Sequence, residues 1–328
     1  MNEPTFAIRY EDVVDAARII APVAIRTPLI ENAVLNERCG RRTFVKFEGA
    51  QHTGSFKFRG AYNRLARLNA AERAAGVVAW SSGNHAQGVA AVARLLGISA
   101  TIVMPADAPA IKLANTRNLG ADVVTYDRRR ESREKIAIAL VEERGATLVP
   151  SYDDPFIIAG QGTAGLEIVD QATDAGAKVG QVLVCCGGGG LTAGIATAMQ
   201  GRSPETQIFA VEPNAFDDTA RSLASGNREC IAADARSICD ALMAPTPGDL
   251  TFPINRALVA GGLTVTDEQV KDAMRFAFSA LKLVVEPGGA VALAALLNGL
   301  APPCDGASVA ILSGGNVDPA YFAEILAG

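Results

Sequence analysis

The most constraining feature of this chain is the alternation of short β-branched runs with longer segments whose apolar residues have helical spacing. Such alternation predicts a mainly parallel sheet covered by helices on both faces, and therefore an α/β fold. Helical spacing is clearest over residues 85–96, 131–143 and 267–281. The expected strands are residues 43–47, 77–80, 100–104, 122–125, 147–149, 181–185, 207–211 and 308–312.

Four motifs lie at the ends of expected strands or just beyond them, although they are far apart in the sequence. In an open α/β sheet the ligand lies at the carboxyl ends of the strands, so we expect the four motifs to share one site. They are TGSFKFRG at 53–60, SSGNH at 81–85, GGGGL at 187–191 and SGGNVD at 313–318.

Two of these motifs indicate specific chemistry. Lys57 lies between Phe56 and Phe58, and partial burial there would lower its pKa, as a Schiff-base lysine requires. The alternative is a surface lysine with a packed stem. The glycines at 187–190 allow backbone N–H groups to converge on a phosphate at the start of a helix. They match neither the dinucleotide nor the ATP-binding glycine pattern, so neither of those sites is supported.

The loop at 81–85 gathers hydroxyl, amide and imidazole groups around Gly83. Such a loop suits the carboxylate of an amino acid, and Asn84 could reach a ring oxygen of a cofactor. The same residues also fit a helix N-cap formed by Ser82 or Asn84, so the loop alone leaves both interpretations open.

Composition and charge exclude several classes of function. The net charge of −5 gives no reason to expect nucleic acid or an anionic membrane as a partner. No run approaches the roughly 20 apolar residues that cross a bilayer, and residues 1–10 lack the apolar core of a signal peptide, so a cytoplasmic protein is expected. The six cysteines form no CxxC pair and are interpreted as reduced thiols. With only His52 and His85, a histidine-rich metal site is excluded.

Six motifs in a fixed order identify a family. The chain resembles the serine/threonine dehydratase and serine racemase family of fold-type II pyridoxal-phosphate enzymes, closest to the serine racemase and 3-hydroxyaspartate dehydratase subgroup. The resemblance implies a tryptophan synthase β-like architecture, with pyridoxal 5′-phosphate between a large domain (1–75 and 151–328) and a small mobile domain (76–150). The motifs are TGSFKFRG, SSGNHAQG, IAGQGT at 158–163, GGGGL, EPGGA at 286–290 and SGGNVD.

The resemblance also implies a role for each site residue. Lys57 would carry the cofactor and serve as the catalytic base, and Phe56 would pack against the cofactor ring. Asn84 would hydrogen-bond the ring hydroxyl, and Ser313 the pyridine nitrogen. The residues implied to hold the phosphate are Gly187, Gly188, Gly189 and Gly190. The residues implied to grip the substrate carboxylate are Ser81, Ser82 and His85.

Two residues relate the chain to the racemase and hydroxyaspartate subgroup. Ser82 occupies a position where typical catabolic threonine dehydratases have alanine, and it would be a second acid/base on the ring face opposite Lys57. Arg133, in the segment ESRE at 131–134, would bind a distal substrate carboxylate through two hydrogen bonds. The alternative for Arg133 is an ion pair on a helix surface.

The same subgroup implies a structural divalent cation, Mg²⁺ or else Ca²⁺ or Mn²⁺. The implied ligands are Glu212, the Phe216 carbonyl and Asp218, and the alternative is an acidic surface loop. The chain also departs from its relatives: it has CDA at 239–241 where they usually have ADG, and Gly288 where Thr or Ser is common. Both changes affect the expected pocket wall.

The resemblance therefore implies a pyridoxal-phosphate-dependent dehydratase, or ammonia-lyase. It would convert a β-hydroxy amino acid (L-serine, L-threonine or 3-hydroxyaspartate) into a 2-oxo acid and ammonia by α,β-elimination. Serine racemisation is the alternative within the enzyme class. A catalytically silent amino-acid sensor is the alternative outside it, although the intact Lys57, Ser313 and glycine run favour an enzyme. A small-molecule substrate and a homodimer are the expected partners.

Overall fold

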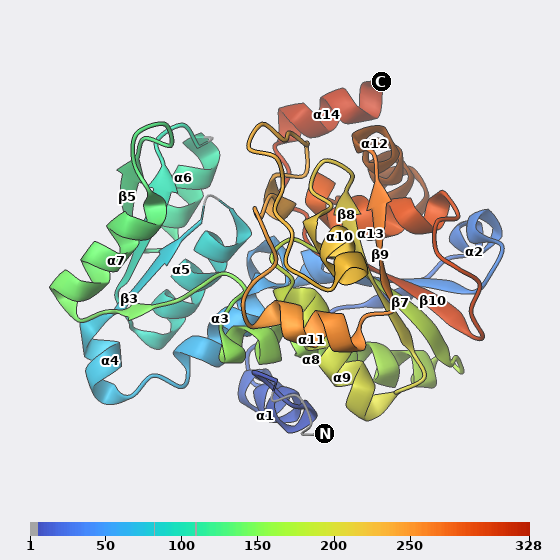
Figure 1. The fold of residues 1–328 in the computed structure, drawn as a ribbon, viewed down its shortest axis with the longest axis horizontal. Coiled ribbons are helices and arrows are strands. Elements are labelled where there is room, and N and C mark those ends of the chain that lie inside the picture. Colours follow the sequence, from blue (N-terminus) through green and yellow to red (C-terminus); the bar gives the residue numbers. More distant parts are fainter. Residues whose placement is uncertain (1–5, 82, 109) are drawn as a thin grey trace.

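The larger of two sheets in this computed structural model, which describes residues 6–81, 83–108 and 110–328, has six strands in the order β1-β2-β10-β7-β8-β9 (Figure 1). Only β1 is antiparallel to its neighbour; the other adjacent pairs are parallel. The strands are β1 (Leu29–Glu31), β2 (Thr43–Phe47), β10 (Ala307–Leu312), β7 (Val179–Cys185), β8 (Gln207–Pro213) and β9 (Gly261–Val265).

The smaller sheet lies to the left of the larger one in Figure 1 and has four parallel strands in the order β5-β4-β3-β6. Its strands are β3 (Val77–Trp80), β4 (Ala100–Pro105), β5 (Asp122–Tyr126) and β6 (Thr147–Leu148). Val77 and Ala79 pack into one core cluster with Val89 of α5 (Asn84–Leu96), while Val78 packs into another with Ala137 of α7 (Arg133–Arg144). This alternation follows from the two-residue period of a strand and covers both faces of the sheet.

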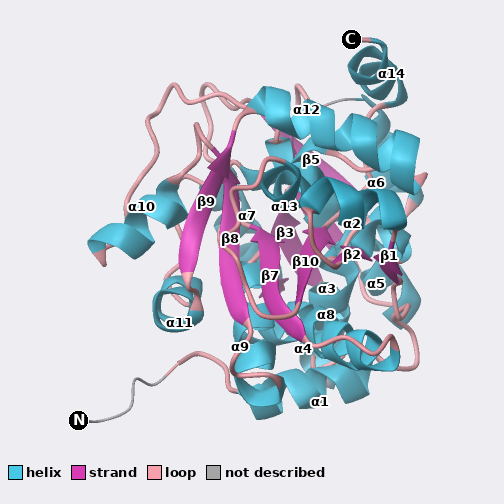
Figure 2. Cartoon of the chain, turned by 90° about the vertical axis from the view of Figure 1, so that its right-hand side faces the viewer, coloured by secondary structure: helices cyan, strands magenta, loops and turns pink. Residues whose placement is uncertain are grey.

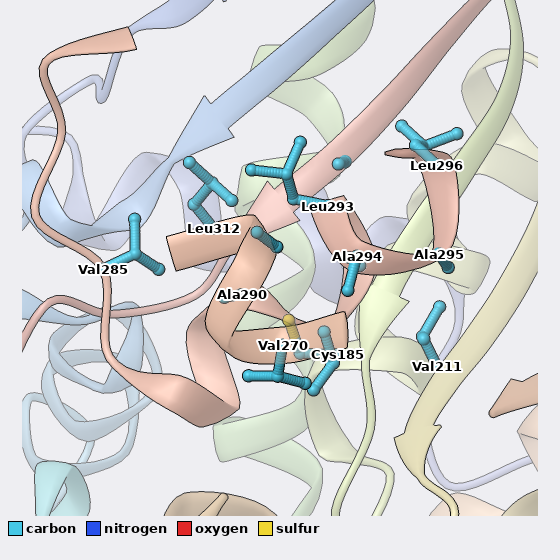
Figure 3. Packing of buried hydrophobic residues seen from close by; sticks show 14 of the residues in the cluster. Cys185, Val211, Val270, Val285, Ala290, Leu293, Ala294, Ala295, Leu296 and Leu312 are labelled. Carbon is cyan, nitrogen blue, oxygen red and sulfur yellow. The ribbon is translucent and has the colours of Figure 1, made fainter. Parts of the chain in front are cut away.

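The faces of the larger sheet are covered in the same way, as Figure 2 shows. On one face, α13 (Pro287–Leu297) is buried along its whole length against β7 and β10, and Figure 3 shows Ala290, Leu293 and Ala294 near Cys185 and Leu312. On the other face lie α8 (Pro155–Asp174) and α9 (Gly190–Arg202). A helix that is apolar all round must be buried, and α13 fits this rule.

The remaining helices complete the layers. In the described part of the chain, no helix is both long and apolar enough to span a membrane. The remaining α-helices are α1 (Tyr10–Ile20), α2 (Ala33–Cys39), α3 (Lys57–Leu65), α4 (Ala70–Ala75), α6 (Ala110–Asn118), α10 (Asp218–Ser225), α11 (Thr251–Leu258), α12 (Asp267–Phe276) and α14 (Pro319–Ala327).

The eight expected strands are confirmed, each overlapping one observed strand, and so is the α/β class. The strands β1 and β9 were missed by sequence because both are edge strands with weak signals: β1 has three residues and β9 begins with two glycines. The helix expected over 267–281 ends as α-helix at Phe276 and continues as a π-helical turn over Ala277–Leu281.

Candidate active site

Three neighbouring strands of the larger sheet, β2, β10 and β7, lead into predicted motifs at the same edge. Residues after β2 lead to Lys57 at the start of α3, β10 leads directly to Ser313, and β7 leads to the glycines at 187–190. Strand β3 of the smaller sheet supplies the loop at 81–85. These motifs meet at a cavity of about 500 Å³ whose lining includes Phe56, Lys57, Ser81, Asn84, His85, Arg133, Gly187, Gly188, Gly189, Gly190 and Ser313.

The Lys57 side chain lines this cavity and is partly buried. Burial disfavours the charged ammonium and lowers the pKa of Lys57 to about 8. Its Nζ donates a hydrogen bond to the carbonyl oxygen of Ser151 at 2.7 Å and lies 5.1 Å from the centre of the Phe56 ring. The amine is therefore neutral over a much wider pH range than that of an ordinary lysine, which a nucleophile or a base requires.

The loop before Lys57 is attached to the loop after β10. The N–H of Phe56 donates to the carbonyl of Ser313 at 3.2 Å, and the N–H of Gly315 donates to the carbonyl of Gly54 at 2.9 Å. An antiparallel bridge between Ser55 and Gly314 lies between these bonds. The two motifs are separated by more than half of the chain, yet they form one hydrogen-bonded unit.

The glycine run forms the N-terminus of α9. Ala193 is the first residue whose N–H donates along the helix, to the carbonyl of Gly189 at 2.8 Å. The N–H groups before Ala193 therefore have no partner inside the helix. Gly189 has φ +90°, which favours glycine. A Cβ on Gly188 would overlap the Tyr152 ring, and one on Gly190 would lie 2.9 Å from the Tyr152 Cβ. Side chains are thus excluded, and the backbone is left to contact an anion.

Helix α11 holds this loop in place, a contribution that the sequence did not indicate. Thr251 Oγ1 donates to the carbonyl of Gly188 at 2.7 Å, and Asn255 Nδ2 donates to that of Gly189 at 3.3 Å. Asp153 in turn accepts backbone N–H groups at the start of α11, including that of Leu250 at 2.8 Å. No short-range pattern links these residues to the glycine run, since the contacts exist only in the folded chain.

The loop at 81–85 also lines the cavity, although Ser82 lies outside the described residues. Ser81 Oγ accepts the N–H of Gly83 at 3.2 Å. The His85 ring is buried, and burial lowers its pKa to about 3. Its Nε2 lies 2.9 Å from the Val149 carbonyl, which can only accept, so Nε2 carries the proton. The ring is therefore neutral, and any contact of His85 with a carboxylate belongs to its backbone.

The mouth of the cavity carries several charged side chains. Arg133, the first residue of α7, is half-exposed, and its Nε donates to Glu134 at 2.8 Å. Both the cavity position and the helix-surface ion pair considered for Arg133 are thus present. Lys112 Nζ of α6 lies 2.6 Å from Asp240 Oδ2. This ion pair joins the segment that contains the smaller sheet to the loop before α11.

The proposed cation ligands lie away from the cavity lining: Glu212 is near the end of β8, Phe216 follows that strand and Asp218 begins α10. Glu212 accepts the N–H groups of Thr219 at 3.0 Å and Ala220 at 2.8 Å, so it caps α10. Burial raises the pKa of Glu212 to about 8 and that of Asp218 to about 7. Within the described residues, Asp218 Oδ2 is buried without a hydrogen-bond partner, and no group of three or more His, Cys, Asp or Glu side chains is arranged to bind a metal.

The two departures from the family pattern are in contact. A Cβ on Gly288 would lie 3.1 Å from the Ala241 Cβ and 3.2 Å from Leu242 Cγ. Ala241 and Leu242 both line the cavity, while Cys239 is buried behind them. A small residue at position 288 therefore makes room for the alanine at position 241.

Comparison with known proteins decides the family. Residues 20–314 match the family described as pyridoxal-phosphate dependent enzyme. The chain belongs to this family. It is 47% identical over 320 residues to the L-threo-3-hydroxyaspartate ammonia-lyase of Pseudomonas sp, covering 97% of this chain and 98% of that protein.

Other members of the pyridoxal-phosphate-dependent family are similar over nearly the same length. The L-threonine ammonia-lyase of Thermotoga maritima is 42% identical over 312 residues, which cover 95% of this chain and 76% of that protein. The solved structure of maize serine racemase superposes with a TM-score of 0.92 at 36% identity, covering 97% of each chain. The fold-type II architecture expected from the motifs is thereby confirmed.

Proposed function

We propose that this enzyme is an ammonia-lyase that removes water and then ammonia from a β-hydroxy amino acid, with 3-hydroxyaspartate as the leading substrate. The observation that carries the proposal is the position of Lys57, whose pKa is lowered, at a cavity shared with Ser313 and the glycine run at 187–190. The similarity to a 3-hydroxyaspartate ammonia-lyase supports both the reaction and the substrate.

The residues at the cavity fit pyridoxal phosphate. Lys57 would bind the cofactor aldehyde covalently, because burial lowers the pKa of its amine to about 8 and so provides far more of the neutral, nucleophilic form than an ordinary lysine has at the same pH. The backbone at 187–190, from which side chains are excluded, would hold the phosphate. Phe56 would pack against the ring, Asn84 would donate to the ring hydroxyl and Ser313 would bond the ring nitrogen, since all three line the cavity.

The chain's own groups account for the remaining steps. When bound, the cofactor supplies an electron sink next to the carbon that bears the amino group. Lys57 Nζ would accept the proton from that carbon, as its lowered pKa suits a base at moderate pH. Ser81, Ser82 and the backbone of His85 would hold the substrate carboxylate. A hydroxyl at Ser313 cannot enforce a charged ring as a carboxylate would, which favours prompt loss of the β-substituent.

Arg133 is the residue we propose for the distal carboxylate of 3-hydroxyaspartate. Its guanidinium lines the cavity and is only half-exposed. Exchange of its present partner, Glu134, for a substrate carboxylate would keep the guanidinium paired with an anion. Serine and threonine lack the second carboxylate and would leave that ion pair unchanged.

A substrate panel tests the proposal. L-Serine, D-serine, L-threonine and the 3-hydroxyaspartates are assayed for ammonia and 2-oxo acid, with Lys57→Ala as the matched control. We expect turnover of at least one β-hydroxy acid, highest for a 3-hydroxyaspartate, and a loss of several orders of magnitude in the variant. Near-normal turnover by Lys57→Ala, or no ammonia from any substrate, contradicts the proposal.

Racemisation of serine is the second candidate, and the similarity to maize serine racemase favours it. The chemistry would require a second acid/base on the ring face opposite Lys57, a role for which Ser82 remains the sequence-based choice. Formation of D-serine from L-serine in the same panel measures this activity beside ammonia release.

We also propose a structural divalent cation, most simply Mg²⁺, held by Glu212, the Phe216 carbonyl and Asp218. The buried, unpartnered Asp218 Oδ2 in the described structure supports it, because a cation would supply the missing interaction. Nothing in the elimination requires this ion.

Three further expectations remain predictions. The segment 76–150 would act as a small mobile domain that closes over the substrate and excludes water, and the separate four-stranded sheet within it supports this. The homodimer can be checked by light scattering, and the cytoplasmic location by cell fractionation.

A further inference from the structure

The side chain of Asn84 is held at both ends by residues of other motifs. Its Oδ1 accepts a hydrogen bond from Asn316 Nδ2 at 2.7 Å, and its Nδ2 donates to Glu286 Oε1 at 2.5 Å. Asn316 belongs to the SGGNVD segment and Glu286 to EPGGA. Neither residue has a role implied by the motifs in the sequence.

The backbone carbonyl of Thr53, which bonds Asn316, determines the direction of these hydrogen bonds. Asn316 Nδ2 also donates to the backbone carbonyl of Thr53 at 2.7 Å, and a carbonyl can only accept. Both hydrogens of that amide are then used, so Asn84 must present its oxygen to Asn316. Its nitrogen consequently faces Glu286, which leaves one N–H of Asn84 unassigned at the cavity.

The supporting residues are themselves closely packed. Thr53 has φ +60°, an uncommon conformation for a β-branched residue, and its carbonyl accepts from Asn316 in this conformation. A Cβ on Gly54 would lie 2.6 Å from Asn316 Oδ1, and one on Gly314 would overlap Glu286 Oε1. The absence of a side chain at both glycines therefore leaves the space that the Asn316 and Glu286 side chains occupy beside Asn84.

Glu286 is an unusual partner for a purely structural role. Its carboxyl is buried, lines the cavity and has Asn84 as its hydrogen-bond donor, with no ion pair to a described basic residue. Burial is the main cause that raises its pKa to about 7; the hydrogen bond from Asn84 opposes this rise, and smaller influences come from Asp240, which raises the pKa, and Lys112, which lowers it. A buried carboxyl without a cation costs stability, which suggests that it is retained for the site.

We propose that Glu286 and Asn316 are positioning residues that orient the Asn84 carboxamide, so that its one remaining N–H is directed to the ring hydroxyl of the cofactor. This inference rests on the proposed function, because it requires bound pyridoxal phosphate. Both residues act through Asn84 and need not touch the cofactor. Loss of either one lets the amide of Asn84 rotate and withdraw its donor.

A double-mutant cycle tests whether Glu286 acts through Asn84, with cofactor affinity as the readout. The dissociation constant of pyridoxal phosphate is measured by titration of visible absorbance and circular dichroism for Glu286→Ala, Asn84→Ala and the double variant. Each single change should weaken binding roughly five- to tenfold, the effect of one hydrogen bond. The double variant should bind no more weakly than Asn84→Ala alone, because Glu286 acts only through Asn84.

Two further variants separate positioning from folding. Glu286→Gln retains an acceptor oxygen for Asn84 and should restore affinity to within about threefold of the native protein. The same cycle is measured with Asn316→Ala in place of Glu286→Ala, and the same result is expected. It gives an independent test if Glu286→Ala lowers the melting temperature of the cofactor-free protein. Losses of affinity that multiply in both double variants, or no rescue by Glu286→Gln, overturn the positioning role of Glu286 and Asn316.

The outcome for the native protein distinguishes this inference from the proposed function. If the native protein takes up no pyridoxal phosphate, the proposed function fails. If it binds the cofactor normally but the cycles are additive, only the positioning role of Glu286 and Asn316 fails.

Discussion

The backbone N–H of Phe56 donates to the carbonyl oxygen of Ser313 at 3.2 Å, so the residue before Lys57 is attached to the end of β10. This bond ties the loop of Lys57, which we propose binds the cofactor covalently, to Ser313, which we propose for the ring nitrogen. A change that separates the two loops should therefore affect cofactor binding even when the residue changed does not touch the cofactor.

Gly54→Ala tests this relationship. Gly54 has φ +73°, and an added Cβ would lie 2.6 Å from Asn316 Oδ1. We expect a loss of about 1–3 kcal/mol in the free energy of unfolding together with weaker cofactor binding. Gly97→Ala is the matched control, since Gly97 has φ +66° with nothing within 4 Å of an added Cβ. It should lose about 1–2 kcal/mol and keep its cofactor affinity; equal affinities in both variants would contradict the expectation.

The lowered pKa of Lys57 predicts the pH dependence of cofactor uptake. Only the neutral amine attacks an aldehyde, and burial places the pKa of Lys57 at about 8 instead of the ordinary 10.5. The rate of pyridoxal phosphate uptake by the cofactor-free protein should therefore rise with pH and level off above about 8. Stopped-flow absorbance measures this rate. A rate that continues to rise toward pH 10 would show that Lys57 titrates as an exposed lysine.

Arg133→Met tests the choice of substrate. If the guanidinium binds the distal carboxylate, kcat/KM for 3-hydroxyaspartate should fall by about one to two orders of magnitude, because a charged hydrogen bond contributes roughly 1.5–3 kcal/mol. Values for serine and threonine should change far less. Parallel losses for all three substrates would instead assign Arg133 to the helix-surface pair with Glu134, and the lyase proposal would stand.

Removal of divalent cations tests the role of Glu212 and Asp218. An ion that binds only the native state stabilises it by about 2.7 kcal/mol at a concentration 100 times its dissociation constant. Chelation should therefore lower the melting temperature, and added Mg²⁺ should restore it without change in the cofactor spectrum. In Asp218→Asn the response should be smaller. A melting temperature that ignores both chelator and Mg²⁺ would indicate an acidic cap of α10 and nothing more.

The contact between positions 241 and 288 predicts a coupled pair. Gly288→Ser brings a Cβ to 3.1 Å from that of Ala241 and should cost about 1–3 kcal/mol through overpacking. Adding Ala241→Gly should recover part of this loss, with a coupling of about 0.5–3 kcal/mol. Urea unfolding of the native protein, the two single variants and the double variant measures it, and strictly additive values would argue against the contact.

The sequence alone determined the α/β class and the eight main strands, and it predicted that Lys57, Ser313 and the glycine run share one site, which they do at the cavity. These features are local: β-branched runs define strands, and glycines at a strand end define a loop that can bind an anion. Their common location also follows from sequence, since the carboxyl ends of parallel strands share one edge.

Tertiary structure alone decided how those residues are supported. Thr251 and Asn255 reach the glycine run, and Glu286 and Asn316 reach Asn84, across separations of 63 to 232 residues. The neutral state of His85 likewise depends on the burial of its ring, which lowers its pKa. Hydrogen-bond direction and desolvation depend on which distant side chains pack together, and no local pattern in the sequence carries that information.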